Sequence, residues 1–326
     1  MKLATLRSGG RDGTLIVVSH DGARYLSAPA TAPTLQRALE SWDEHEPLLR
    51  ELERKLADDP SSGTPLSVQD LHSPLPRSYQ WAEASSYLSH MERIRRARGM
   101  ELPPDHERNV PAYQGGADLN LPPRGEVALA DESWGLDIEG TVVVITDDVP
   151  RARTAESARE HIKLISLTND FTFRHLLPAE YARGLGMYQA KPARPYAPFA
   201  ITPDELGAAW DGRTAAVRVS CAVNGKLLGS PNAGSDCAFG FGEIIAHLTL
   251  TRGLGAGTIV GSGTVSNRDP AVGHACLAER RAVELAERGT SDTDFLEVGD
   301  SVRVEAFDEN ERSVFGSIEH VVCAGD

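Results

Sequence analysis

Two acidic side chains stand at the entrance to a strongly apolar segment. Asp137 and Glu139 come shortly before Val142–Ile145, a run of apolar residues typical of a buried strand. Acids separated by one residue point to the same face of a strand. A buried strand seldom begins with carboxylates unless these are paired, hydrogen-bonded or bound to a cation. The pattern therefore predicts a site for a hard cation such as Mg²⁺ or Ca²⁺, with ordinary surface acids as the alternative.

Further polar residues sit in apolar surroundings later in the chain. The apolar pattern at residues 164–167 is followed closely by Asp170, and Arg174 comes four residues later. Lys191 lies in an apolar segment bounded by prolines, so it is either buried against an anion or a solvated loop lysine.

A histidine and a tyrosine add two candidate groups. Glu83 and His90 are seven residues apart in a segment that becomes helical, so we expect both on one helical face. A structural core histidine is the alternative for His90. Residues 109–124 are rich in Gly, Pro and Asn and predict a surface loop, with Tyr113 and the glycines after it close to a ligand.

The elements that must position these groups divide the chain into two parts. Residues 1–28 predict short antiparallel strands, residues 33–55 show helical periodicity, and the segment 59–63 ends that helix. We therefore expect a small N-terminal α+β domain over residues 1–70 and a larger domain over residues 71–326.

The second part is dominated by strands punctuated by glycine. A hairpin with an Asn224-Gly225 turn is expected over 214–230. The other expected elements are helices at 243–252 and 278–288 and strands at 301–307 and 313–322. The fold class is α+β, mainly β, and a roll or sandwich fits better than a parallel α/β sheet.

Composition limits the function. The chain has 326 residues and a formal net charge of −14 at pH 7, with no basic tract, which disfavours nucleic acid and anionic membranes as partners. It has no long apolar run, and its first residues lack the pattern of a signal peptide. The 4 cysteines form no CxxC pair. We expect reduced thiols in a cytoplasmic protein.

Taken in order, the motifs resemble one family. They are Trp81-Ala82-Glu83 with His90, Leu136-Asp137-Ile138-Glu139, Asn169-Asp170-Phe171-Thr172-Phe173-Arg174, Gln189-Ala190-Lys191-Pro192, Gly261-Ser262-Gly263-Thr264-Val265-Ser266-Asn267 and Ala278-Glu279. The series is similar to the fumarylacetoacetate hydrolase family. It is most similar to bacterial members of about this length, which resemble 2-keto-4-pentenoate hydratase and 2-oxohepta-3-ene-1,7-dioate hydratase.

The resemblance implies a fold and a chemistry. The family has a β-roll or sandwich C-terminal domain with a smaller N-terminal domain, usually in a homodimer. Its members act on β-dicarbonyl and 2-oxo acid substrates, and a divalent cation holds the substrate's enolic oxygens. Mg²⁺ is the first expectation for this chain, with Ca²⁺ or Mn²⁺ as alternatives.

The resemblance also assigns roles to individual residues. Metal ligands would be Glu83, Glu139 and Asp170. His90 would be the general base, oriented by Glu279. Arg174 and Lys191 would bind substrate oxygens and stabilise the carbanion that leaves, while Thr264 would contact substrate. Tyr113, expected near a ligand from its own loop, is the further candidate substrate contact.

The sequence departs from the family pattern at the metal site. Thr141 stands where a fourth carboxylate ligand is usual, and Glu83 stands where an aspartate is usual. Because the number of charged ligands largely sets the affinity for hard cations, we expect weakened or altered metal binding, with water or the Thr141 oxygen filling the gap.

Three functions follow from this sequence. The first is a metal-dependent hydrolase that cleaves a C–C bond in a β-dicarbonyl or acylpyruvate substrate such as fumarylacetoacetate, through His-activated water and a metal-stabilised enolate. The second is decarboxylation, hydration or isomerisation of a 2-oxo acid on the same fold. The third is a diverged, non-catalytic member, which Thr141 favours and the intact His90, Glu279, Lys191 and Arg174 disfavour.

Overall fold

A computed structural model describes residues 1–59, 61–102 and 104–325. Pro60, which falls in the predicted break at 59–63, and the last residue of the predicted second domain lie outside the described residues.

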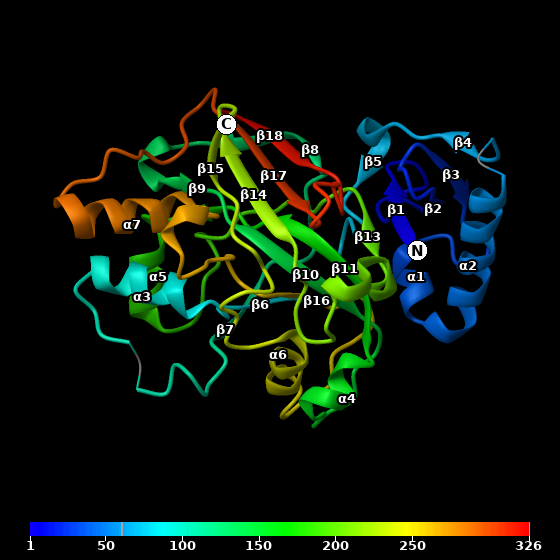
Figure 1. Cartoon of the computed structure of the whole chain (residues 1–326), viewed down its shortest axis with the longest axis horizontal. Helices are drawn as coiled ribbons and strands as arrows, with labels where there is room; N and C mark the ends of the chain where they lie inside the picture. Colours follow the sequence, from blue (N-terminus) through cyan, green and yellow to red (C-terminus); the bar gives the residue numbers. More distant parts are fainter. Residues whose placement is uncertain (60, 103, 326) are drawn as a thin grey trace.

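A large sheet runs through the molecule from the N-terminal strands to the centre (Figure 1). In spatial order its strands are β4 (Thr64–Pro65), β3 (Arg24–Ser27), β2 (Thr14–Val18), β1 (Lys2–Leu6), β13 (Ala200–Ile201), β11 (Ile162–Asn169), β10 (Gly140–Thr146), β16 (Ile259–Gly261), β6 (Trp81–Ala84) and β7 (Ala112–Gly115), with β5 (Leu71–His72) paired to β1. Neighbouring strands are antiparallel except for the parallel pair β16 and β6.

A second sheet covers the central strands. It consists of β15 (Lys226–Gly229), β14 (Arg218–Val223), β17 (Ser301–Phe307), β18 (Ile318–Ala324) and β8 (Arg124–Leu129). β14 contacts β10 and β17 contacts β11, and the core between them contains apolar side chains of both sheets, such as Val144 and Val304. β9 (Leu136–Asp137) and β12 (Thr172–Phe173) form a small separate ladder. This arrangement confirms the mainly-β roll or sandwich.

The helices lie in groups at both ends of the sheet and beside its central strands. They are α1 (Leu35–Leu39), α2 (Trp42–Asp58), α3 (Leu88–Ala97), α4 (Ala155–Arg159), α5 (Leu177–Arg183), α6 (Phe241–Leu248) and α7 (Leu277–Arg288), and the 3₁₀ turns are η1 (Val68–Asp70), η2 (Glu132–Trp134), η3 (Pro203–Ala209) and η4 (Pro270–Val272). α1 and α2 lie beside the N-terminal strands, while α3 packs against α7 far from them (Figure 1). None of the helices in the described ranges is long and apolar enough to cross a membrane.

Local patterns predicted several of these elements well. The hairpin turns at Asn224-Gly225, where both residues have positive φ, and the strand at 301–307 has the expected bounds. Four predictions need correction. The helix expected at 33–55 is two helices, and the helix expected at 243–252 spans 241–248. The strand expected at 313–322 begins only at Ile318, and the loop expected at 109–124 contains β7. β7 is a strand because it pairs with β6, a partner 30 residues away in sequence at Glu83 and Tyr113.

The N-terminal strands continue the central sheet through β1, which pairs with β2, β5 and β13. The boundary between the two parts at residue 70 stays a prediction.

Candidate active site

Three carboxylates meet where neighbouring strands of the large sheet end. Glu83 lies near the end of β6, Glu139 just before β10 and Asp170 just after β11. The register pairs Gly140 with Asn169 and Glu83 with Gly261, which brings these strand ends together. All three side chains are buried, and one oxygen of each lies within 4.8 Å of the others. We call Glu83, Glu139 and Asp170 the carboxylate cluster.

Asp137 does not belong to this cluster, contrary to the expectation that it would share a cation with Glu139. β9 ends at Asp137 and β10 begins at Gly140, so the two acids do not share a continuous strand. The Asp137 carboxylate accepts hydrogen bonds from the amides of Leu277 (2.7 Å) and Ala278 (3.0 Å). It thus sits at the N-terminus of α7, where backbone N–H groups and the helix dipole favour an anion.

Lys191 is buried among the carboxylates. Its ammonium lies 2.8 Å from Glu139 Oε2, 2.5 Å from Asp170 Oδ2 and 3.8 Å from Glu83 Oε2. It also donates to the Thr172 hydroxyl at 2.8 Å. Of the two interpretations of Lys191, the structure shows the buried lysine paired with anions.

Two arginines extend the pairing on either side. Arg174 donates to Asp137 at 2.7 Å through Nε and to Glu139 through Nη2. Arg194, which is fully buried, donates through Nε to Asp170 at 2.6 Å and lies over the ring of Trp81. Acids and bases therefore alternate along one chain of ion pairs: Asp137, Arg174, Glu139, Lys191, Asp170 and Arg194.

This pairing decides the ionisation of the cluster. Burial opposes the charged form of Asp170, but Lys191 and Arg194 outweigh it and hold the pKa of that carboxyl well below its usual range. Burial likewise opposes the charge on Glu139, and Arg174 and Lys191 lower its pKa.

Glu83 behaves differently from the other two acids. Burial, and then the charge of Asp170, raise the pKa of Glu83 well above its usual value. The Tyr113 hydroxyl lies 2.6 Å from both Glu83 Oε2 and Asp170 Oδ2. A phenol carries a single proton, so the Tyr113 hydroxyl can donate to only one of these two carboxylates at a time. Thr141 Oγ1 donates to the other oxygen of Glu83 at 3.2 Å.

A histidine and a carboxylate form a second group beside the cluster. His90 Nδ1 lies 2.7 Å from Glu279 Oε2, and Glu279 is 0% exposed. Burial opposes its charge, but hydrogen bonds with His274 and His90 outweigh burial and keep the pKa of Glu279 well below its usual value. An ionised Glu279 places the proton of neutral His90 on Nδ1, which leaves Nε2 as an acceptor.

Glu83 and His90 reach the site from different elements. The prediction that they share a helical face is wrong, because Glu83 lies on β6 and only His90 lies on α3. The chain turns between them, so the site is assembled from a strand end and a separate helix.

A cleft of about 310 Å³ brings the predicted groups together. It is lined by Glu83, Ala84, Ser85, His90, Pro111, Ala112, Tyr113, Glu139, Arg174, Leu177, Tyr181, Met187, Lys191, Gly263 and Thr264. Glu279, Asp170 and Thr141 lie behind this lining and contact it through His90, Lys191 and Glu83. The cleft therefore has a charged side and an apolar side that includes Leu177, Tyr181 and Met187.

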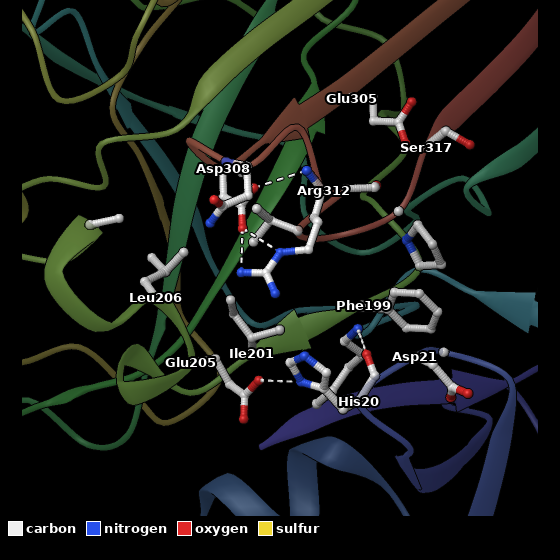
Figure 2. Close-up of a pocket in the computed structure, with 18 of the residues that line it drawn as sticks. His20, Asp21, Phe199, Ile201, Glu205, Leu206, Glu305, Asp308, Arg312 and Ser317 are labelled. Carbon is white, nitrogen blue, oxygen red and sulfur yellow. Dashed lines mark hydrogen bonds and ion pairs between the residues drawn. The ribbon is translucent and has the colours of Figure 1, made fainter.

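A larger hollow of about 990 Å³ lies elsewhere, between β13 and the end of β17 (Figure 2). None of the carboxylate cluster lines it. Polar side chains inside it pair with one another: His20 lies 3.6 Å from Glu205, and Arg312 donates to Asp308 at 2.9 Å. It is not the site formed by the predicted residues.

Sequence reasoning missed several residues that hold the site. Glu279 also accepts from Arg93 (2.6 Å), Ser266 (2.9 Å) and His274 (3.1 Å). Arg93 follows His90 by three residues on α3, and this helical spacing could have identified it. Arg194 stands in a Pro-rich segment with no periodicity, and nothing local signals its pairing with Asp170.

The carboxylate cluster fits a hard divalent cation in the chemistry of its donors. It offers oxygens from three acids on separate strand ends, the ligand type that Mg²⁺, Mn²⁺ and Ca²⁺ prefer. His90, Cys276 and Glu279 also lie within 4.8 Å of one another. Burial raises the pKa of the Cys276 thiol well above its usual value, which disfavours the thiolate that a metal requires.

The fold and this cleft define a protein of the fumarylacetoacetate hydrolase family, and the chain belongs to that family. The family model described as fumarylacetoacetate (FAA) hydrolase C-terminal matches residues 80–323, and that of the fumarylacetoacetase N-terminal domain 2 matches residues 1–77. A search of curated proteins finds no matching sequence.

Several solved structures share the fold over 100% of both chains. A maleylpyruvate hydrolase from Sphingobium sp. SYK-6, in complex with manganese(II) ion and pyruvate, is 16% identical with a TM-score of 0.65. A fumarylacetoacetate hydrolase from psychrophilic Exiguobacterium antarcticum is 19% identical with a TM-score of 0.62. A 5-carboxymethyl-2-hydroxymuconate delta-isomerase from Mycobacterium smegmatis is 15% identical with a TM-score of 0.60. At these identities the likeness establishes the fold, which carries both hydrolases and an isomerase.

Proposed function

We propose that this protein is a hydrolase that cleaves a C–C bond in a β-dicarbonyl or acylpyruvate substrate. The observation that supports this most directly is the single cleft in which a His–carboxylate pair faces an oxygen-rich cluster and two buried cations. The structural relative that holds Mn²⁺ and pyruvate is a maleylpyruvate hydrolase, which agrees with an acylpyruvate substrate.

The carboxylate cluster would hold the divalent cation through Glu83, Glu139 and Asp170. Such a cation supplies Lewis-acid polarisation of a bound carbonyl oxygen. Mg²⁺ is proposed first, with Mn²⁺ and Ca²⁺ as alternatives, because all three accept carboxylate oxygens. The acidic ligands also repel a substrate carboxylate, so the substrate's negative groups need the cations of the cleft.

His90 is the proposed general base. Its Nδ1–H points to Glu279 at 2.7 Å, so Nε2 can take a proton from a water molecule in the cleft. Glu279 holds the ring and stabilises the imidazolium that forms. Arg93, Ser266 and His274 fix Glu279 in turn. The hydroxide formed attacks the carbonyl next to the bond that breaks.

Arg174 and Lys191 are the proposed partners of the substrate oxygens. Cleavage leaves the electron pair of the C–C bond as an enolate, and cations placed beforehand stabilise that charge. The enolate then takes back the proton held by the His90 imidazolium. Arg174 Nε and Nη2 are used by Asp137 and Glu139, which leaves Nη1 for a substrate oxygen. Thr264 and Tyr113 line the same cleft and are proposed substrate contacts.

The non-catalytic alternative finds little support in the site. Thr141 stands in place of a carboxylate, yet its hydroxyl is hydrogen-bonded to Glu83. The hydrogen bond between His90 and Glu279 is present. Decarboxylation, hydration and isomerisation differ from hydrolysis in their products, so they are outcomes of the test below. A homodimer, a cytoplasmic location and the absence of nucleic-acid and membrane partners stay predictions.

The test is product analysis with a matched control. Protein stripped with a chelator is incubated with acetylpyruvate, fumarylpyruvate and fumarylacetoacetate, with and without Mg²⁺ or Mn²⁺, and products are identified by NMR. Hydrolysis predicts two acids in equal amounts. Release of CO₂, or a product of unchanged mass, would refute it. His90→Ala serves as the inactive control, and His20→Ala, in the separate hollow of Figure 2, as the control that keeps activity.

A further inference from the structure

Lys191 has no hydrogen-bond donor left for a substrate. An ammonium carries three N–H groups, and Glu139, Asp170 and Thr172 accept from Lys191 at 2.8, 2.5 and 2.8 Å. Its side chain is 4% exposed. A lysine that is to bind a substrate oxygen must first lose one of these partners.

The ammonium lies where the carboxylate oxygens converge. It contacts Glu139 and Asp170 directly, and Glu83 Oε2 is 3.8 Å away. A divalent ion with the same ligands requires oxygens at about 2.0–2.6 Å. Lys191 Nζ, at hydrogen-bond distance from Glu139 and Asp170, therefore competes with a divalent ion for the same carboxylate oxygens.

Lys191 also sits within a chain of paired charges. In the alternating chain, Asp137, Glu139 and Asp170 face Arg174, Lys191 and Arg194, three anions against three cations. At the remaining acid, Glu83, Thr141 presents a hydroxyl, which brings no charge. A divalent ion added to this arrangement places its charge next to an ammonium in a buried site, which is strongly unfavourable.

We propose that Lys191 is the resident cation of the carboxylate cluster and that a divalent cation binds only by displacing its ammonium from Glu139 and Asp170. Binding of the cation and release of Lys191 are then one exchange. The consequence of this exchange rests on the proposed function. The displaced ammonium has N–H groups free to donate to a substrate oxygen in the cleft that Lys191 lines.

The exchange is tested by calorimetric titration of Mn²⁺ into chelator-stripped protein. Lys191→Met removes the competing charge while keeping an unbranched side chain of similar length. It should bind Mn²⁺ at least about tenfold more tightly than the native protein, because the ion no longer displaces a cation. Without Mn²⁺ its Tm should fall, since Glu139 and Asp170 lose their partner, and Mn²⁺ should restore it. Lys226→Met, at an exposed position of β15, should leave both quantities unchanged.

A second measurement needs no variant at the site, in case Lys191→Met does not fold. Native protein is acetylated with acetic anhydride, with and without Mn²⁺, and modification is mapped by mass spectrometry. Mn²⁺ should increase acetylation of Lys191 and leave that of Lys226 unchanged.

Either of two results would overturn the exchange: an Mn²⁺ affinity in Lys191→Met equal to or weaker than native, or bound Mn²⁺ that leaves Lys191 protected. These outcomes are separate from those of the proposed function. Metal-dependent hydrolysis by the native protein with no gain in affinity in Lys191→Met refutes the exchange alone. A gain in affinity in Lys191→Met with no hydrolysis by the native protein refutes the hydrolase alone.

Discussion

Replacing Glu279 by glutamine tests the pairing of Glu279 with the proposed base His90, with a minimal change in shape. The carboxylate accepts hydrogen bonds from His90, Arg93, Ser266 and His274 and is fully buried. An amide keeps one accepting oxygen and turns the other position into a donor. If that donor faces His90, it requires an accepting Nδ1 and so changes the tautomer of the ring. If it faces Arg93, it removes the ion pair that holds the side chain of residue 279 beside the ring.

The expected loss follows from the role of a positioned base. General-base catalysis contributes about 10²–10⁴-fold to rate, so kcat of Glu279→Gln should fall by that range, or about 3–5 kcal/mol in activation free energy. KM should change by only a few-fold, because Glu279 does not line the cleft. The assay is release of the two acids from an acylpyruvate with Mn²⁺ present, followed with Tm to show that the variant is folded.

Glu284→Gln is the matched control. Glu284 is a buried glutamate on the same helix, α7, and its carboxylate accepts from Thr293 and Ser291 instead of from His90. It should keep kcat within about threefold, a change below 1 kcal/mol. A folded Glu279→Gln protein with kcat near the native value would refute the assignment of Glu279 as the residue that positions the base.

Three further predictions concern stability, metal affinity and reactivity. Burial opposes the charge of Glu284, but hydrogen bonds from Thr293 and Ser291 lower its pKa to about 2. A carboxyl whose pKa is lower in the folded than in the unfolded chain, where it is about 4.3, stabilises the fold at every pH above that unfolded pKa. The Tm advantage of native protein over Glu284→Gln should therefore be constant near neutral pH and shrink as pH falls toward 2. A difference in Tm that stays constant down to pH 2 would contradict this. Thr141→Glu should bind Mg²⁺ more tightly by calorimetry, since it adds ligand charge beside Glu83, and equal affinities would count against a role for position 141. Iodoacetamide should modify half-buried Cys323 before buried Cys276, whose thiol pKa burial raises; peptide mapping that finds Cys276 modified first would refute the burial argument.

Patterns within a few residues predicted much of the fold. The apolar run at Val142–Ile145 and the Asn224-Gly225 turn identify β10 and a hairpin, because burial and positive φ have local signatures. β7 and the break between β6 and α3 were missed, because they depend on pairing with strands distant in sequence.

The candidate site was predicted by motif order more than by periodicity. The spacing of Asp137 and Glu139 suggested one shared cation. Because β9 ends at Asp137, this carboxylate lies instead at the N-terminus of α7. Arg194 could not be found at all, since its pairing with Asp170 depends on how a Pro-rich segment runs beside the end of β11. Charge balance in a buried site is a property of the assembled fold.

The most direct test of the proposed function is the product balance of one reaction. Chelator-stripped native protein is given acetylpyruvate, and pyruvate and acetate are quantified by NMR before and after Mg²⁺ or Mn²⁺ is added. The hydrolase predicts no turnover without the cation and equal amounts of the two acids with it. Turnover that is unchanged by the cation, or pyruvate without a matching second acid, would contradict the proposal.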